Sequence, residues 1–218
     1  MQNNKKFIVV IGDIVSSKKV EKRSALQYKL QEVFNHLNTS GTENHLISPF
    51  TITLGDEFQA VYEKADRLFL DSISILESAF PQKIRFSFGI GEISTDINRL
   101  QSIGMDGSAF YFAREGILAL KKQRGDFKFN IYGLEDPEQE KLFNNFLRIY
   151  SNLLEGWHKN RYFILWKTMT GKPVKEIAKE LALSETAVYM NIYDGNIREI
   201  IAIQEVMINH INNKLLEK

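Results

Sequence analysis

The sequence predicts an α/β fold of the ferredoxin-like type, followed by an all-helical part that contains a helix-turn-helix. Three observations support this prediction. The nearly continuous apolar run FIVVIGDIV (7–15) is typical of a buried central strand, strand and helix patterns alternate up to Tyr132, and the rest of the chain shows only helical periodicity. The segment GLEDP (133–137) separates the two parts, so we expect domains at 1–133 and 138–218.

The composition excludes several classes of protein. The chain has 218 residues, of which 44% are hydrophobic and 25% charged, so it can bury a substantial core. The formal net charge of +1 gives no global attraction to nucleic acid or membrane, and the lack of Cys excludes disulfides and thiolate zinc sites. The start MQNNKKF has no signal-peptide pattern, and no apolar run reaches the roughly 18 residues that span a bilayer. We therefore expect a cytoplasmic protein without a membrane partner.

Hydrophobic periodicity defines the remaining elements of the first domain. An amphipathic helix, a hairpin of two short strands, a second amphipathic helix, an alternating strand, a third helix and a last strand follow the first strand. In this order they cover residues 26–37, 51–62, 64–79, 84–93, 110–120 and 127–132. The resulting order β-α-β-β-α-β-α-β contains the split βαβ arrangement, in which the first strand lies beside the hairpin strands.

The alternating strand at 84–93 has an unusual face. Its apolar side chains point one way, while Arg85, Ser87, Gly89 and Gly91 point the other. Two glycines on one face indicate close approach by a ligand or another backbone, and packing against a helix explains them equally well. The next helix exposes a basic face with Arg114, Lys121, Lys122 and Arg124.

Acidic residues lie at two points that this topology brings together. Asp13 is near the end of the first strand, and Asp56 and Glu57 are at or beside the tip of the hairpin. Carboxylates at one edge of a sheet suit a hard cation such as Mg²⁺. A helix cap at Asp13 and a solvated turn at 55–57 are the alternatives.

The residues after Asp13 suit a phosphate group. They include Ser16, Ser17 and Lys18, and backbone N–H groups at a helix start beside such side chains can hold an anion. A capped, solvated helix N-terminus is the alternative explanation.

Several motifs, in order, resemble the bacterial SatD family: DIVSS (13–17), GDEF (55–58), FGIGEI (88–93) and MDGSAF (105–110). More distantly, they are similar to the palm domain of class III nucleotide cyclases and diguanylate cyclases. That resemblance implies that Asp13 and Asp56 hold Mg²⁺ or Mn²⁺ and that Glu57 is an adjacent acid. It also implies a triphosphate site for ATP or GTP, at Ile14, Val15, Ser16, Ser17 and Lys18.

The third helix departs from the cyclase pattern. Tyr111 stands where cyclases have an Asn, and Arg114 lies one residue early for the Arg that stabilises the transition state. By this comparison the metal and phosphate half of the site is retained and the catalytic half is altered. If the palm is an enzyme, its catalytic residues are Asp13, Asp56, Glu57 and Arg114.

The pattern GKPVKEIAKELALSETAVYMNI (171–192) predicts a helix-turn-helix with Ser184 as an N-cap, and it resembles that of sigma-factor region four. The expected DNA-contacting residues are Lys175, Thr186, Tyr189 and Asn191. Residues 138–218 carry 11 Lys and Arg against 10 Asp and Glu, which is little charge for phosphate neutralisation. A packing or dimerisation module is therefore the alternative.

Together these patterns favour a nucleotide-responsive regulator of transcription that binds a purine nucleotide and DNA. The last helix, with an apolar stripe between Ile200 and Leu215, is explained by core packing or by a dimer interface, and we expect a homodimer. One alternative is a nucleotidyl cyclase or nucleotidyltransferase that makes a signalling nucleotide by two-metal chemistry. Another is a palm scaffold that binds no nucleotide.

Overall fold

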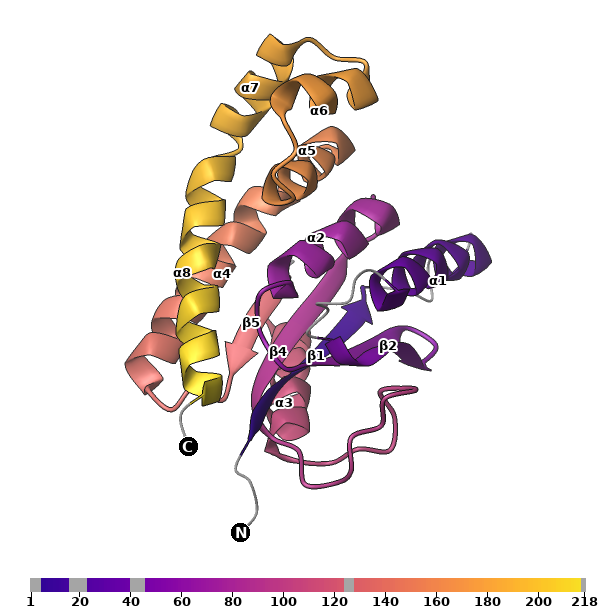
Figure 1. Cartoon of the computed structure of the whole chain (residues 1–218), viewed down its shortest axis with the longest axis vertical. Coiled ribbons are helices and arrows are strands. Elements are labelled where there is room, and N and C mark those ends of the chain that lie inside the picture. Colours follow the sequence, from indigo (N-terminus) through magenta and orange to yellow (C-terminus); the bar gives the residue numbers. More distant parts are fainter. Residues whose placement is uncertain (1–4, 16–22, 40–45, 124–127, 217–218) are drawn as a thin grey trace.

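The computed structural model describes residues 5–15, 23–39, 46–123 and 128–216. Within these ranges the chain forms five strands and eight helices (Figure 1). The strands are β1 (Lys6–Ile14), β2 (Leu46–Leu54), β3 (Glu57–Tyr62), β4 (Ile84–Glu92) and β5 (Phe129–Tyr132). The helices are α1 (Arg23–Thr39), α2 (Leu68–Ala79), α3 (Ser108–Lys122), α4 (Pro137–Glu155), α5 (Lys159–Met169), α6 (Val174–Leu181), α7 (Glu185–Asp194) and α8 (Ile197–Leu216).

The strands form one sheet in the order β2-β3-β1-β4-β5. β1 is central and runs antiparallel to both β3 and β4, β2 is antiparallel to β3, and β5 is parallel to β4. The first four strands therefore have the ferredoxin-like arrangement, and the predicted fold class is confirmed. The end of β1 and the hairpin tip lie side by side, as the topology predicts.

Helices cover both faces of the sheet, and the strands alternate accordingly. Ile8, Val10 and Ile14 of β1 belong to the large core beneath α1 and α2. Val9 and Ile11 point the other way, into a smaller core with Ala109, Ala113 and Ile117 of α3. By the same alternation Asp13 lies on the α3 face of the sheet.

Glycines allow α3 to lie unusually close to the sheet. A Cβ on Gly89 would lie 2.2 Å from the Ala109 carbonyl oxygen and 2.3 Å from the Ala113 nitrogen. One on Gly91 would lie 2.7 Å from the Ala109 nitrogen. The glycine face of β4 therefore packs against a helix, which decides between the explanations that the sequence left open.

The helical part is continuous with the sheet rather than separated from it. The ring of Phe129 on β5 stacks on Tyr150 of α4 at 5.4 Å, and Phe80 contacts Tyr162 of α5 at 5.9 Å. One hydrophobic core includes residues from both sides of the predicted boundary at 133–137. The boundary marks the change from α/β to all-α structure; two separate domains stay a prediction.

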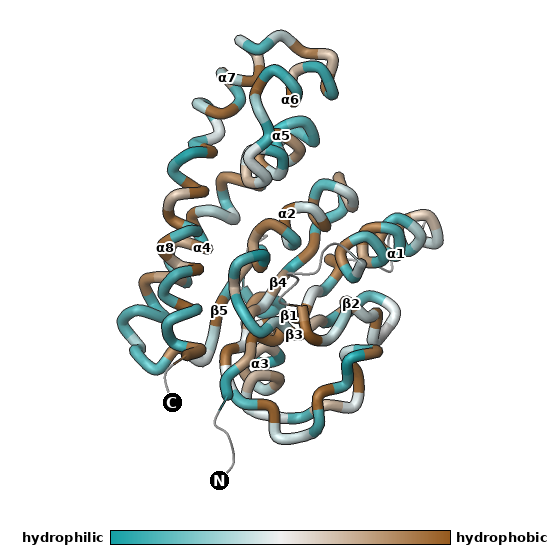
Figure 2. Tube along the Cα trace, viewed as in Figure 1, coloured by the Kyte–Doolittle hydropathy of each residue, from teal (hydrophilic) through white to brown (hydrophobic). Residues whose placement is uncertain are grey.

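The long helix α8 runs back alongside α4 (Figure 1), and its hydrophobic and hydrophilic residues alternate as expected for one buried side (Figure 2). Ile200, Met207, Ile211 and Leu215 are buried in the core, whereas Ile203 is 42% exposed. Most of the predicted stripe is therefore core. None of the helices in the described ranges combines the length and apolar character needed to cross a lipid bilayer.

Candidate functional site: a charged cluster beneath α3 and a helix-turn-helix

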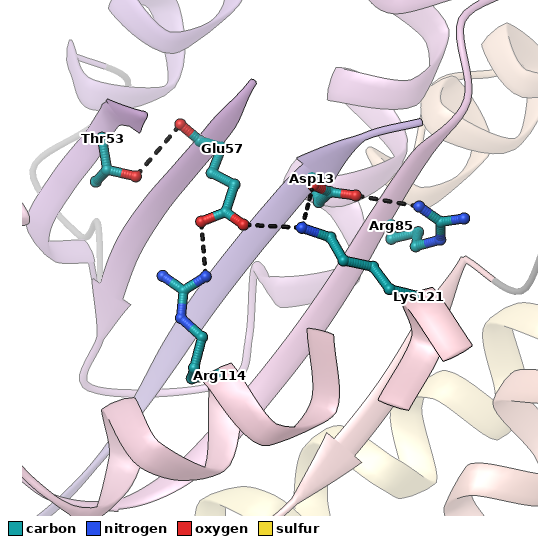
Figure 3. Close-up of polar contacts among 6 residues, drawn as sticks. All are labelled: Asp13, Thr53, Glu57, Arg85, Arg114 and Lys121. Carbon is teal, nitrogen blue, oxygen red and sulfur yellow. Dashed lines mark hydrogen bonds and ion pairs between the residues drawn. The ribbon is translucent and has the colours of Figure 1, made fainter. Parts of the chain in front are cut away.

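The strand register places three charged residues in one row at the end of the sheet. Asp13 on β1 pairs with Glu57 on β3 and with Arg85 on β4. Directly paired residues have side chains on the same face, so all three point toward α3 (Figure 3). The acid that faces Asp13 in the register is therefore Glu57, beside the hairpin turn.

Helix α3 adds two cations to this row. Arg114 and Lys121 are seven residues apart, which places them on the same side of the helix. Lys121 Nζ lies 2.8 Å from Asp13 Oδ1 and 3.0 Å from Glu57 Oε1, so it bridges the two acids (Figure 3). Arg114 Nη1 donates to Glu57 Oε2 at 2.6 Å, and Arg85 Nη1 donates to Asp13 Oδ2 at 3.1 Å.

Burial and charge act against each other in this cluster. The side chains of Asp13 and Glu57 are only 5% and 9% exposed. Burial raises the pKa of Glu57, but the hydrogen bonds and charges of Arg114 and Lys121 outweigh it, and the net pKa is lowered. Burial lowers the pKa of Lys121, but Asp13 and Glu57 outweigh that effect and raise it. Both groups are therefore held in their charged forms.

Asp56 is joined to this site through its backbone. It lies in the turn before β3, and its carbonyl oxygen accepts a hydrogen bond from the Ile14 nitrogen at 2.9 Å. The Val15 nitrogen donates to the Lys83 carbonyl oxygen, also at 2.9 Å. A phosphate held by the Ile14 and Val15 amides, as the sequence suggests, has to displace these carbonyls.

The rest of the predicted phosphate site, at Ser16, Ser17 and Lys18, lies outside the described residues. The sequence missed Arg85 as a site residue and assigned Lys121 to the exposed face of its helix. The available signals were the position of Arg85 on the glycine face of its strand and the spacing between Arg114 and Lys121.

The cluster does not fit a resident metal ion. Each of the four carboxylate oxygens of Asp13 and Glu57 already faces a cationic nitrogen. Across the ranges that the structure describes, no group of three or more His, Asp or Glu side chains is arranged to hold a metal. Mg²⁺ and Mn²⁺ would meet a site that the chain's own cations have neutralised.

The second site is the helix-turn-helix formed by α6 and α7, which lies at one end of the molecule, away from the sheet (Figure 1). α6 ends at Leu181, and its C-cap Ala182 adopts a left-handed conformation at φ 52° and ψ 40°. Ser184 caps α7 through a bond from the Ala187 nitrogen to its hydroxyl at 3.1 Å, as the sequence predicts. Val188 and Ile192 are buried, which fixes the outward face of α7.

The predicted DNA-contacting residues differ in their surroundings. Lys175, Thr186 and Tyr189 are exposed. Asn191 is turned inward: its amide nitrogen donates to the Ala187 carbonyl at 2.9 Å, and its oxygen accepts from Arg161 Nε at 3.2 Å.

Basic residues beside α7 are partly neutralised. Lys172 forms ion pairs with Glu180 and, at 3.9 Å, with Glu176, while Lys167 lies 3.9 Å from Glu180. The hydrogen bond to Glu180 and the charge of Glu180 raise the pKa of Lys172, so Lys172 stays protonated within these ion pairs. The basic patch therefore consists mainly of Lys175 and Lys179, both exposed on α6.

Fold and sites together define a mixed α/β protein with a ferredoxin-like sheet and a helix-turn-helix attached to it. The model of the SatD family matches residues 7–197, and the chain belongs to this family. A solved structure described as a bacterial light-regulated adenylyl cyclase is similar over 58% of this chain, with 16% identity and a TM-score of 0.33. The match spans 43% of that chain, less than half its length. No curated protein matches.

Proposed function

We propose that this protein is a cytoplasmic DNA-binding regulator of transcription whose α/β part senses a purine nucleotide. The observation that carries the proposal is the uncovered face of α7. Tyr189 and Met190 are 49% and 59% exposed, and Thr186 is exposed beside them, at the end of the molecule (Figure 1). A helix presented in this way fits the major groove of DNA, where its first turns contact base edges.

The proposed contacts divide by role. Thr186 and Tyr189 reach base edges or phosphates from α7, and Lys175 contacts phosphate from α6. Asn191 contacts DNA only if its side chain gives up the hydrogen bond that it accepts from Arg161. Because one module supplies few cations, we propose that two copies bind DNA together as a homodimer, which doubles the phosphate contacts.

The nucleotide proposal rests on the cationic excess of the charged cluster. Arg85, Arg114 and Lys121 outnumber Asp13 and Glu57, and the side chains of Arg114 and Lys121 are 42% and 37% exposed. Phosphates of ATP or GTP can pair with these two cations by competing with the acids. In this proposal Mg²⁺ arrives with the nucleotide rather than as a resident ion.

DNA binding is tested by selecting sequences from random duplexes and measuring affinity by fluorescence anisotropy. Thr186→Ala and Tyr189→Ala should each weaken binding to the selected sequence by about 5- to 100-fold, with unchanged thermal unfolding. Tyr28→Ala is the matched control, because Tyr28 is a 66% exposed tyrosine on α1. Equal affinity of wild type for selected and random DNA would exclude sequence-specific binding.

A nucleotidyl-transfer enzyme is the second candidate, favoured by the direct opposition of Asp13 and Glu57. Calorimetric titration of ATP and GTP, with Mg²⁺ or Mn²⁺, separates the two, with Asp13→Asn and Asp56→Asn as site variants. Binding without turnover supports a sensor. Release of pyrophosphate that depends on these acids supports an enzyme, and no binding under any condition leaves a palm scaffold without a nucleotide.

A further inference from the structure

The charged cluster places two negatively charged carboxylates side by side, which is unusual. Asp13 and Glu57 are paired in the strand register and are almost completely buried. Like charges directly opposite one another destabilise a sheet, and buried carboxylates need a compensating cation. The structure must therefore supply positive charge between them.

We infer that the ammonium group of Lys121 stands in the place of a metal ion between Asp13 and Glu57, so that wild-type protein binds no divalent cation there. Its nitrogen lies 2.8 Å from one oxygen of Asp13 and 3.0 Å from one oxygen of Glu57. Both distances are those of charge-assisted hydrogen bonds. The inference is independent of whether the protein binds DNA or nucleotide.

The remaining oxygens are also taken. Asp13 Oδ2 faces Arg85 at 3.1 Å, and Glu57 Oε2 faces Arg114 at 2.6 Å. Lys121 is the only one of the three cations that contacts both acids, within the ion pairs of this cluster. Removing its charge therefore unbalances both carboxylates at once, whereas removing Arg85 or Arg114 unbalances one.

The backbone fixes the position of this cation. Lys121 lies in the last turn of α3, where the helix dipole favours a positive charge. Gly89 and Gly91 let α3 approach the sheet, and Gly116 lies over Ser87, where an added Cβ would be 2.0 Å from the Ser87 hydroxyl. Lys121 therefore reaches the acids from a helix that is packed tightly along β4, and its placement does not depend on a loop.

Without Lys121, the two opposed and buried carboxylates would lose the cation that bridges them. Such a pair suits a hard divalent cation, which takes carboxylate oxygens together with water. The inference thus predicts a gain of metal binding on removing one positive charge: Lys121→Ala should bind Mn²⁺ at Asp13 and Glu57, and wild type should not.

The test is a titration with Mn²⁺. Binding is measured by calorimetry and by the loss of the electron-paramagnetic-resonance signal of free Mn²⁺. We expect Lys121→Ala to bind Mn²⁺ at least about tenfold more tightly than wild type does. It should also gain thermal stability when Mn²⁺ is added. Lys122→Ala is the matched control on the neighbouring exposed residue. It should behave like wild type, as should Lys121→Arg, which keeps the charge.

Two results would overturn the inference. One is wild-type protein that binds Mn²⁺ as tightly as Lys121→Ala and loses this binding in Glu57→Gln. The other is a folded Lys121→Ala protein, verified by circular dichroism, that gains no Mn²⁺ affinity. If Lys121→Ala does not fold, Lys121→Met, which keeps the aliphatic stem, takes its place. Loss of the gained affinity in the double variant Lys121→Ala/Glu57→Gln would assign the ion to this site.

Discussion

The ammonium group of Lys121, on α3, bridges the carboxylates of Asp13 and Glu57, which lie on two neighbouring strands of the sheet that α3 packs against. The nitrogen is 2.8 Å from Asp13 Oδ1 and 3.0 Å from Glu57 Oε1. This bridge joins the central strand, the hairpin and α3. The charge balance of the site and the packing of α3 against the sheet therefore depend on each other.

Neutralising Lys121 should therefore destabilise the fold. Removing one partner of a fully buried ion pair costs roughly 3–5 kcal/mol. Because the Lys121 side chain is 37% exposed, solvent screening reduces this, and we expect Lys121→Met to lower the free energy of unfolding by about 1–3 kcal/mol. Urea denaturation measures the change. Lys122→Met should leave stability within about 0.5 kcal/mol of wild type, and an equal loss in both variants would contradict a specific role of Lys121.

The cluster should also give the protein an acid-sensitive contribution to stability. The pKa of Glu57 is lowered below its ordinary value of 4.5, with burial opposed and outweighed by Arg114 and Lys121. A lowered folded-state pKa adds stability that is complete above 4.5 and is lost as pH falls through the folded value. Wild type should therefore exceed Glu57→Gln in stability most at neutral pH, and the difference should shrink on acidification.

Urea denaturation of wild type and Glu57→Gln, measured from neutral pH down through the lowered pKa of Glu57, checks the prediction. Glu92→Gln, at the exposed last residue of β4, is the control for replacing a carboxylate elsewhere in the sheet. A Glu57→Gln difference that grows on acidification would show that the carboxylate is destabilising in the folded protein.

Because α3 lies so close to β4, one methyl group added at Gly89 should strongly reduce the stability of the fold. In Gly89→Ala the new Cβ would lie 2.2 Å from the Ala109 carbonyl oxygen, and backbone cannot move aside without shifting the helix. We expect a loss of about 1–3 kcal/mol in the free energy of unfolding. Gly156→Ala is the control, because its Cβ would meet the nearest atom at 4.0 Å. Equal stability of the two variants would contradict the packing described here.

The ion pairs beside α7 predict how DNA binding depends on salt. Glu180 pairs with Lys172 and lies 3.9 Å from Lys167, so Glu180→Gln should release a cation toward DNA phosphates. The slope of log affinity against log salt should become steeper by about 0.9 for one new phosphate contact. Anisotropy titrations at several salt concentrations measure it. Glu205→Gln removes the same charge from α8, and an identical slope change there would exclude a local effect.

Much of the fold could be predicted from the sequence because its signals are local. The alternation of 84–93 and the apolar run at 7–15 define strands, and Ser184 marks the start of α7. The ferredoxin-like order then follows from the sequence of elements. The segment 133–137 lies between β5 and α4, as its Gly and Pro suggest, but aromatic contacts across it, such as Phe129 with Tyr150, depend on tertiary packing.

The site was less predictable because its key contacts are between distant segments. Lys121 reads as a solvent-facing residue on an amphipathic helix, and only the packing of that helix against the glycine face of β4 brings it to the acids. Asp13, Asp56 and Glu57 were expected to lie together, and which of the two hairpin acids pairs directly with Asp13 depends on the turn geometry; the register places Glu57 there. The inward turn of Asn191 likewise depends on Arg161 from another helix.

The most direct test of the proposed function is the affinity of the purified protein for its selected DNA sequence, measured with and without ATP or GTP. If the α/β part senses nucleotide, one of the two should change the DNA affinity by about fivefold or more, and DNA should change the nucleotide affinity by the same factor. The change should vanish in Arg114→Ala, whose side chain pairs with Glu57 in the cluster. Specific DNA binding that neither nucleotide alters, or nucleotide binding without any affinity for DNA, would contradict the account.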